Sequence, residues 1–405
     1  MAIKSQTEKL WTKYFTITFI SAMFTSTSNG MLMTGIPLYA LYIGGDNTIS
    51  GLLFGLFMLV AILFRPFFGK LIDEKTRIIV LIIGSMITVF LSVTFIFAYS
   101  IGLLLIIRSM QGIGFSATTN ALGTIVADIV PKSRLAEGVG YFGLSNTISM
   151  AIGPSLSLFL INQFSYNVYF IAVVLIGLVG LVSSFLIDYE KKIKDIGVVS
   201  QPPPSRKLSE MIFEKTTIPS SLVMFFIFIG MGAIITFVPI YALSLGIDDI
   251  GIYFTVYSIA LLVTRIGVGK ISDKYWAAKV ILPGMLIIIF SYIVLAYSTS
   301  LPAFIVAGIL YGIGHGSVDP TLNAIMVKFC PTNRRGAGNS TLFTAKDVGS
   351  GMGAVVWGII SINAGFRTVF LLCALCIVLG LVSYFFILRK QIQKGKLADK
   401  VPQTV

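Results

Sequence analysis

The stretch Arg65-Pro-Phe-Phe-Gly69-Lys70-Leu-Ile-Asp73 recurs 200 residues later as Arg265-Ile-Gly-Val-Gly269-Lys270-Ile-Ser-Asp273. Arg, Gly, Lys and Asp keep one spacing in both copies. Each copy lies where a long apolar run ends and a short basic stretch begins. An internal repeat at a fixed offset indicates an architecture of similar units. The sequence therefore predicts two similar halves, each carrying this motif.

The composition around the repeat indicates an integral membrane protein. Of the 405 residues, 56% are hydrophobic and 12% are charged, whereas soluble domains are about a quarter charged. Many apolar runs are long enough to cross a hydrocarbon core of about 30 Å as helices. We count about twelve, near 14–42, 50–69, 77–98, 101–129, 138–162, 168–188, 217–244, 250–270, 279–298, 302–328, 338–361 and 367–388.

A polar, Pro-rich segment separates the first six runs from the last six, and such a composition is typical of a linker. The prediction is an all-α membrane fold with a six-helix bundle over 1–188, a cytoplasmic linker over 189–216, and a second bundle with a short cytoplasmic tail over 217–405. Because six spans return the chain to its starting side, the halves are parallel repeats, which places a substrate site between them. Further matches at the same offset are Gln111-Gly112-Ile-Gly114 with Tyr311-Gly312-Ile-Gly314, Pro131 with Pro331, Gly138 with Gly338, and Ser149 with Gly349.

Positive charge is confined to one side of the predicted spans. Of the 30 Lys and Arg residues, all except Arg108, Lys346 and Arg367 fall near the N-terminus, in every second connection, or in the tail. Basic connections are retained in the cytoplasm, so both termini are expected there, in a plasma-membrane protein. This distribution accounts for the net charge of +13 without a nucleic-acid partner.

Few residues could form a metal or catalytic centre. The three cysteines, Cys330, Cys373 and Cys376, lie in or beside apolar runs. We therefore expect no disulfide framework, no metal site and no cofactor. An enzyme needs a nucleophile, a base and an orienting group, or several metal ligands, in one place. The single histidine, His315, makes an intramembrane enzyme a remote alternative.

Three motifs resemble those of a known family. Gly69-x-Leu-x-Asp73 and its second copy resemble the signature loop of the major facilitator superfamily. Arg108-Ser-Met-Gln111-Gly112 is similar to that family's span-four signature. Gly140, Ser149 and Gly153-Pro154 resemble the span-five motif of its 12-span drug/proton antiporters, with Ser149 in place of a usual glycine. The resemblance implies the major facilitator fold and a central cavity lined by spans one, four, seven and ten.

The repeated motif suggests a conformational latch. Its glycines would let a helix of the other half pack closely, and its aspartates could accept hydrogen bonds from a helix N-terminus or pair with an arginine. Such contacts would form in one conformation and break in the other. Alternatively, the motif marks a cytoplasmic turn. The latch candidates are Arg65, Gly69, Asp73, Arg77, Arg265, Gly269 and Asp273.

Ionisable side chains inside spans are costly and are therefore candidates for function. Asp319 and Asp347 are the clear intramembrane acids, and a buried carboxylate can load and release a proton as solvent access changes. His315 lies one turn before Asp319 on the same helix face. Arg108 could take part in proton coupling, pair across the cavity or attract an anionic group. All four are proton-coupling candidates, and the alternative for each is a structural hydrogen-bonding role.

The first and seventh spans carry no charge, which predicts a largely apolar cavity suited to amphipathic molecules. Polar residues in the spans could contact substrate or bond neighbouring helices, and apolar ones could face lipid. The cavity candidates are Asn29, Gln111, Asn120, Asn323, Met33, Phe226 and Tyr311.

The leading hypothesis is a secondary transporter that exports small, drug-like amphipathic molecules in exchange for protons, by alternating access. Alternatives are a same-fold transporter of a specific metabolite, metallophore or lipid in either direction and, more remotely, a membrane sensor or receptor. The expected partners are a small-molecule substrate, protons and the lipid bilayer. Because each chain has a complete site between its halves, it is expected to function as a monomer.

Overall fold

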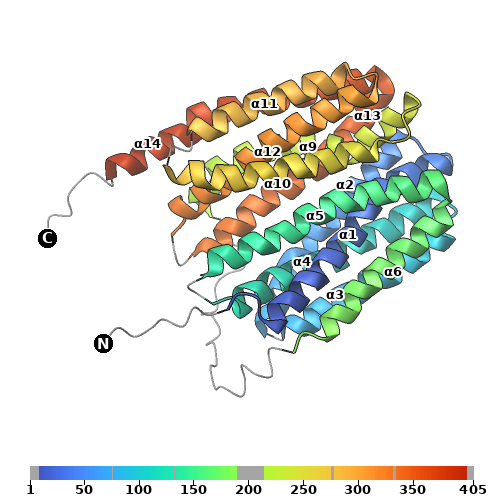
Figure 1. Cartoon of the computed structure of the whole chain (residues 1–405), viewed down its shortest axis with the longest axis horizontal. Coiled ribbons are helices and arrows are strands. Elements are labelled where there is room, and N and C mark those ends of the chain that lie inside the picture. The colour runs from blue at the N-terminus through green and yellow to red at the C-terminus, as the bar shows by residue number, and fades with distance from the viewer. Residues whose placement is uncertain are drawn as a thin grey trace.

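The structure, a computed structural model, describes residues 9–74, 76–131, 134–188, 214–274, 278–331 and 334–398, and within them the chain forms helices and no strand. The helices of the first half are α1 (Lys13–Tyr42), α2 (Asn47–Glu74), α3 (Arg77–Thr94), η1 (Phe95–Phe97), α4 (Ile101–Ile129), α5 (Leu135–Gln163) and α6 (Tyr166–Phe185). Those of the second half are η3 (Lys215–Thr217), α9 (Ile218–Ser244), α10 (Gly251–Lys274), α11 (Ala278–Ala296), α12 (Leu301–Phe329), α13 (Arg335–Ser383), η5 (Tyr384–Leu388) and α14 (Arg389–Ala398). The two halves lie side by side in Figure 1.

The long helix α13 contains two of the predicted spans. Gly365, inside it, has a φ of 77° and is not helical. Glycine adopts this left-handed conformation without a Cβ clash, so the kink separates the eleventh span from the twelfth. The predicted all-α membrane fold is confirmed. The predicted linker lies mostly outside the described residues.

Several spans begin at a capped turn. Thr76, Ser100 and Ser165 each accept a hydrogen bond from the backbone N–H three residues on, at 3.3, 3.3 and 3.4 Å. Such a cap satisfies one of the N–H groups that a helix leaves unpaired at its start. Lipid supplies no hydrogen-bond partner, so these polar residues suit the ends of membrane helices.

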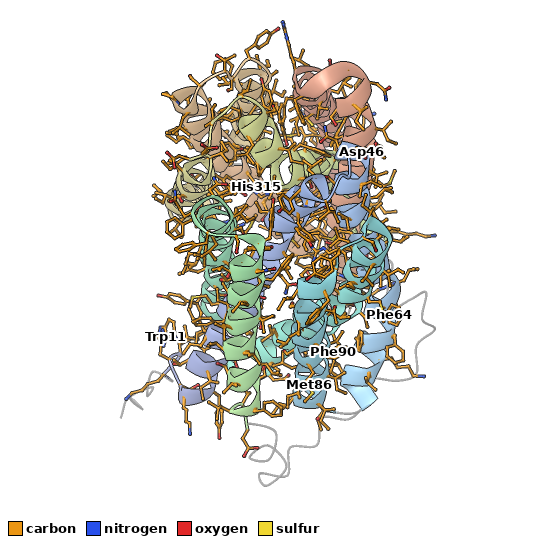
Figure 2. All side chains as sticks on the ribbon, turned by 90° about the vertical axis from the view of Figure 1, so that its right-hand side faces the viewer. Trp11, Asp46, Phe64, Met86, Phe90 and His315 are labelled. Atoms are coloured by element: carbon orange, nitrogen blue, oxygen red, sulfur yellow. The ribbon has the colours of Figure 1, made fainter. Side chains whose placement is uncertain are left out.

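Large apolar side chains cover the outside of the molecule. Met86 and Phe90 of α3 are exposed, and Figure 2 shows both at the outer edge of the first half. Among the described residues, nine helices are long and apolar enough to cross a membrane, one of them holding the eleventh and twelfth spans. The helix α1 falls outside that set because it is rich in Ser and Thr. It packs against α5 and α6 within the first half, so much of its surface meets protein rather than lipid.

The halves meet where α2 packs on α13 and α5 packs on α10. A group of apolar side chains, which we call the central apolar cluster, joins α2 to α13. Its buried members are Phe54, Phe57, Met58 and Ala354, with Met33, Phe115 and Ile235 packed against them.

Contact between the halves is tight at one end of the molecule. We call the end that holds the α2–α3 turn, the start of α1 and α14 the basic end, as Figure 1 shows. Far from it, a Cβ on Gly51 would lie 2.2 Å from the carbonyl oxygen of Ala354. Near the basic end, a Cβ on Gly69 or on Gly267 would meet none of the described atoms within 4 Å. The close packing expected at Gly69 is therefore absent from this conformation, because α2 approaches α13 nearer its other end.

Glu214 anchors the start of the second half. Its carboxylate accepts hydrogen bonds from the backbone N–H and the hydroxyl of Thr216, at 3.1 and 2.9 Å. It also pairs with Arg334, at 2.7 Å, in the connection between α12 and α13. The hydrogen bond from the Thr216 backbone is the main cause that lowers the pKa of Glu214.

Candidate functional site

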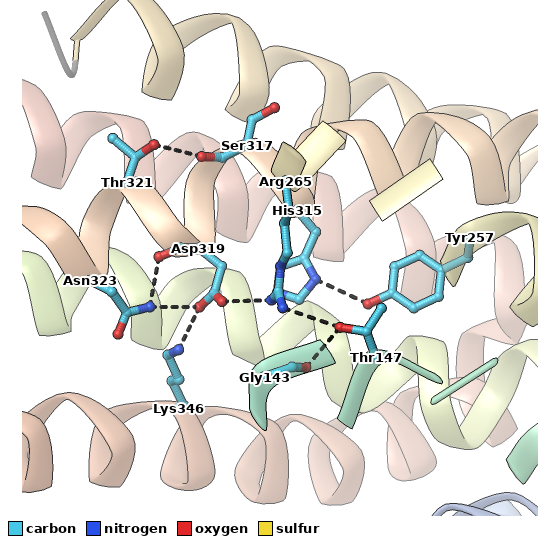
Figure 3. A network of polar contacts seen from close by, with 10 residues as sticks. All are labelled: Gly143, Thr147, Tyr257, Arg265, His315, Ser317, Asp319, Thr321, Asn323 and Lys346. Atoms are coloured by element: carbon cyan, nitrogen blue, oxygen red, sulfur yellow. Dashed lines mark hydrogen bonds and ion pairs between the residues drawn. The ribbon is translucent and has the colours of Figure 1, made fainter. Parts of the chain in front are cut away.

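Asp319 of α12 lies at the centre of a cluster of ionised side chains between the halves (Figure 3). One carboxylate oxygen is 2.5 Å from Lys346 Nζ on α13, and the other is 3.1 Å from Arg265 Nη2 on α10. Asn323, one turn on, donates to the Asp319 carbonyl at 2.7 Å and to its carboxylate at 3.3 Å. The Asp319 side chain is 13% exposed. Three elements of the second half thus converge on one carboxylate.

Arg265 connects this carboxylate to the first half. Its Nη1 donates to Thr147 Oγ1 on α5 at 3.2 Å, while its Nη2 bonds Asp319. Figure 3 shows the guanidinium between the two partners. Thr147 is oriented by its own hydrogen bond to the carbonyl of Gly143, at 3.1 Å. A change in the charge of Asp319 would therefore alter the contact between Arg265 and Thr147, which joins the two halves.

Arg65 makes the corresponding contact on the other side of the interface. Its Nη2 lies 2.5 Å from Asp347 Oδ2, which joins α2 to α13. At the 200-residue offset, Arg65 matches Arg265 and Asp347 matches Thr147. The repeat thus produces two contacts between the halves at matching positions. One is the ion pair of Arg65 with Asp347, and the other is the hydrogen bond of Arg265 to the uncharged Thr147. We call Arg65, Arg265, Lys346, Asp319 and Asp347 the charged network.

Both arginines lie inside helices rather than in connections. The predicted spans 50–69 and 250–270 contain these arginines, whereas the count of basic residues assigned both to the connections, and the helices agree with the spans. The helices α2 and α10 continue past the apolar runs to Glu74 and Lys274. The packing of α2 on α13 and of α10 on α5 brings the two arginine side chains to the interface between the halves.

His315 bonds a tyrosine rather than its neighbour Asp319. Its Nδ1 is 3.0 Å from the hydroxyl of Tyr257, and its ring centre lies 6.3 Å from that of Tyr257 and 5.7 Å from that of Tyr311. Its Nε2 is buried without a hydrogen-bond partner among the described residues. Tyr311 is fully buried, with its hydroxyl 3.4 Å from the sulfur of Met231. Both side chains therefore lie in an aromatic group behind the charged network.

Arg108 is separate from the charged network. It is 1% exposed, its Nη1 donates to Gln111 Oε1 at 2.7 Å, and its guanidinium lies 3.9 Å from the centre of the Phe57 ring. Gln111 in turn donates to Ser92 at 3.2 Å. The second Nη of Arg108 has no acceptor among the described residues. A cation–π contact stabilises the charge in part.

The remaining cavity candidates divide between helix contacts and the interface. Asn29 donates to the backbone of Thr25 at 3.0 Å, and Asn120 donates to the backbone of Arg65 at 3.2 Å. Met33 packs against the central apolar cluster. Phe226 lies against Gly380, whose added Cβ would be 3.3 Å from Phe226 Cβ.

The span-five motif packs α5 on α1 within the first half. Ser149 donates to the carbonyls of Met23 and Ser145, at 2.8 and 2.9 Å. A Cβ on Gly153 would lie 3.0 Å from the backbone of Gly30. Pro154 follows inside α5, and a Cβ on Gly140 would meet nothing within 4 Å.

The latch residues are only partly described. Arg77 pairs with Asp128 at the end of α4, at 3.2 Å. Asp73 and Asp273 lie near the ends of α2 and α10, and their side chains fall outside the described residues, as do the surroundings of Gly269.

Comparison with known proteins identifies the family. A model described as Major Facilitator Superfamily matches residues 18–275 and 220–404. The chain belongs to this superfamily. It is 26% identical over 386 residues to the staphylopine export protein of Staphylococcus aureus, covering 91% of this chain and 94% of that one. It is 25% identical over 410 residues to a multi-drug resistance efflux pump PmrA homolog of Lactococcus lactis, with 96% and 98% covered.

Solved structures of this fold agree with the architecture. A bacterial homolog of the human lysosomal transporter Spinster gives a TM-score of 0.71 at 15% identity, covering 94% of this chain and 97% of that one. At this identity the likeness shows the fold alone. Membership of the superfamily makes the chain a transporter rather than an enzyme. In the described part of the chain, no three His, Cys, Asp or Glu side chains gather as metal ligands.

Sequence reasoning missed Thr147 and Tyr257, and it noted Lys346 without making it a site candidate. A threonine in an apolar span carries no signal of its own. The repeat could have identified Thr147, because it lies 200 residues before the candidate Asp347, just as Arg65 lies 200 residues before Arg265. Lys346 was noted beside Asp347, and its partner is Asp319.

Proposed function

We propose that this transporter resides in the plasma membrane and exports small organic molecules in exchange for protons, by alternating access. Support comes from the two relatives above, which are named for export and efflux. Further support comes from the charged network, which lies between two parallel halves, where transporters of this architecture bind substrate. One chain supplies both halves, so the working unit is a monomer.

The coupling proposal depends on one observation, the sharing of the Asp319 carboxylate. Lys346 belongs to the same half, whereas Arg265 also bonds Thr147 in the other half. A proton on Asp319 would remove the charge that holds both cations, and Arg265 would keep Thr147 as its partner. Protonation is thereby linked to a contact between the halves, and a ligand shifts an equilibrium only through such differential contacts.

The direction of loading follows from the charge pattern. Basic connections are retained in the cytoplasm, so we place the basic end there, with both termini. The tight contact at Gly51 then closes the external end, and the open space at Gly69 lies toward the cytoplasm. A substrate would enter this conformation from the cytoplasm, as export requires.

In the opposite conformation the latch would form. Closure of the basic end would bring α2 against the second half at Gly69, where a glycine allows close approach. Asp73 would then meet a helix start or an arginine, with Arg77 and Asp128 beside it. The contacts at the external end would open in the same movement.

The proposal is tested in proteoliposomes that contain a trapped pH-sensitive dye. Addition of aromatic carboxylates, ammonium compounds and neutral compounds, one at a time, should cause proton movement for at least one class. Asp319→Asn should abolish this movement. Asp248→Asn, the same change in an exposed acid near the α9–α10 turn, should leave it intact. Proton movement retained in both Asp319→Asn and Asp347→Asn would refute the coupling proposal.

A second candidate is export of one dedicated compound rather than of many. The relative from Staphylococcus aureus is named for a single compound, and it aligns over 91% of this chain. A screen in which one compound alone competes for transport would favour this candidate, whereas competition by many unrelated compounds would favour a multidrug exporter.

A further inference from the structure

We infer that the transported molecule is an anion whose carboxylate, or a group of similar charge and shape, binds beside Arg265 and Arg65 between the halves. The inference rests on the proposed function and names the substrate class of the same site. Its basis is the charge balance, the exposure and the pseudo-symmetry of the charged network.

The charged network carries a surplus positive charge. Arg65, Arg265 and Lys346 oppose two carboxylates, those of Asp319 and Asp347. The other acids of the chain lie at helix ends, in connections or near the termini. An uncompensated charge inside a membrane protein is costly. A bound anion would make the numbers of positive and negative groups equal.

The two arginines are the most accessible members of the charged network, whereas Lys346 is only 8% exposed. The side chains of Arg265 and Arg65 are 30% and 21% exposed, against 13% and 14% for Asp319 and Asp347. The Nε atom of each arginine is buried and has no acceptor among the described residues. A guanidinium presents planar pairs of donors that match a carboxylate or a phosphate. An anion would therefore meet the exposed parts of two arginine side chains, whereas a cation would meet carboxylates that are already paired.

Pseudo-symmetry indicates where a carboxylate is missing. Asp347 neutralises Arg65, and the matching position in the first half, Thr147, offers Arg265 a hydroxyl. A substrate carboxylate beside Thr147 would supply Arg265 with what Asp347 supplies to Arg65. A Cβ on Gly143, one turn earlier in α5, would meet nothing within 4 Å in the described part of the chain, so this side of the contact has space.

This assignment changes the expected character of the site. Spans one and seven are uncharged, which predicted an apolar cavity for lipophilic molecules. The charges come instead from α2, α10, α12 and α13. An apolar body beside an anionic group fits the central apolar cluster and the charged network together. Exchange of such an anion for a proton would move two charges across the membrane, so transport would respond to the membrane potential.

The test compares 1-naphthaleneacetate with 1-naphthylmethylammonium, which share a ring system and differ in charge. Binding to the purified full chain in detergent is measured by titration calorimetry. We expect the carboxylate to bind at least about tenfold more tightly, as one charged hydrogen bond allows. Arg265→Gln should weaken its binding, and Arg367→Gln, in an arginine stacked on Tyr297 outside the network, should not.

The decisive pair of variants changes Thr147. Thr147→Asp adds the carboxylate that the first half lacks and should remove the preference for the anion. Thr147→Asn keeps an acceptor for Arg265 without the charge and should retain the preference. Aspartate and asparagine can each accept the hydrogen bond from Arg265 that threonine accepts, so both variants should fold. Thermal unfolding of the two variants checks this.

Three results would overturn the assignment: equal or tighter binding of the ammonium compound, an unchanged preference in Thr147→Asp, or no binding of either compound. Vesicle transport separates this assignment from the proposed function. A chain that binds the carboxylate but moves neither compound would refute export and leave the anion site. A chain that moves only the ammonium compound would refute the anion site and leave the proposed export function.

Discussion

Replacing Asp319 by Asn removes one negative charge from the charged network and keeps the shape of the side chain. Lys346, whose side chain is 8% exposed, would lose the carboxylate that lies 2.5 Å from its Nζ. Arg265 would keep Thr147. Removal of one partner of a buried ion pair costs about 3–5 kcal/mol. Because the amide still accepts a hydrogen bond and Arg265 is partly solvated, we expect a loss of about 3 kcal/mol in the free energy of unfolding.

A second substitution isolates the electrostatic cause. Lys346 lies 5.1 Å from the centres of the Phe228 and Phe343 rings, so Lys346→Met would place an apolar chain among apolar neighbours. The double variant removes both charges and should be more stable than Asp319→Asn alone, because no unpaired ammonium group remains. The assay is unfolding in mixed micelles with increasing SDS, followed by tryptophan fluorescence. Additive losses, or a loss below about 0.5 kcal/mol for Asp319→Asn, the range of ordinary surface substitutions, would refute the reasoning.

Three further predictions concern the ends of the molecule. Gly51→Ala should destabilise the contact at the tight end by about 1–3 kcal/mol, because its Cβ would overlap the α13 backbone. Labelling of cysteines introduced at this end should therefore increase. Gly69→Ala, the same change in open space, should have no effect in this conformation. Asp73→Asn should slow vesicle transport more than Asp273→Asn, because only the first copy of the motif is followed by an arginine, and equal effects would count against a dominant first-half latch. The pKa of Glu214 is lowered mainly by a backbone hydrogen bond. Its stabilising contribution is therefore present at neutral pH and is lost as the pH falls below about 4.3, the ordinary pKa of a glutamate. Unfolding of Glu214→Gln should show a weaker pH dependence in that acidic range than unfolding of the unaltered chain.

Local signals in the sequence determined the architecture. The repeated motif indicated two halves, and the apolar runs located the spans to within a few residues. Both signals are read along the chain, since span length is set by the thickness of a hydrocarbon core. The division of α13 at Gly365 also has a local cause, because a left-handed φ favours glycine.

The sequence also identified the two acids of the charged network, through the cost of ionisable groups inside spans, and its two arginines, through the repeat. It could not determine their partners. His315 is one turn from Asp319 and bonds Tyr257, whereas Lys346, 27 residues away, bonds Asp319 directly. Helical spacing limits which side chains share a face, and the packing of neighbouring helices decides which of them pair.

Tertiary structure alone decided two features of the site. The packing of α2 on α13 and of α10 on α5 places Arg65 and Arg265 at the interface between the halves. The contact between Arg265 and Thr147 joins residues 118 positions apart in different halves. The sequence determined which carboxylates enter the membrane, because the cost of burial acts on each residue separately. The fold decided how those charges are balanced, because an ion pair depends on the distance between two groups, which only the packed helices establish.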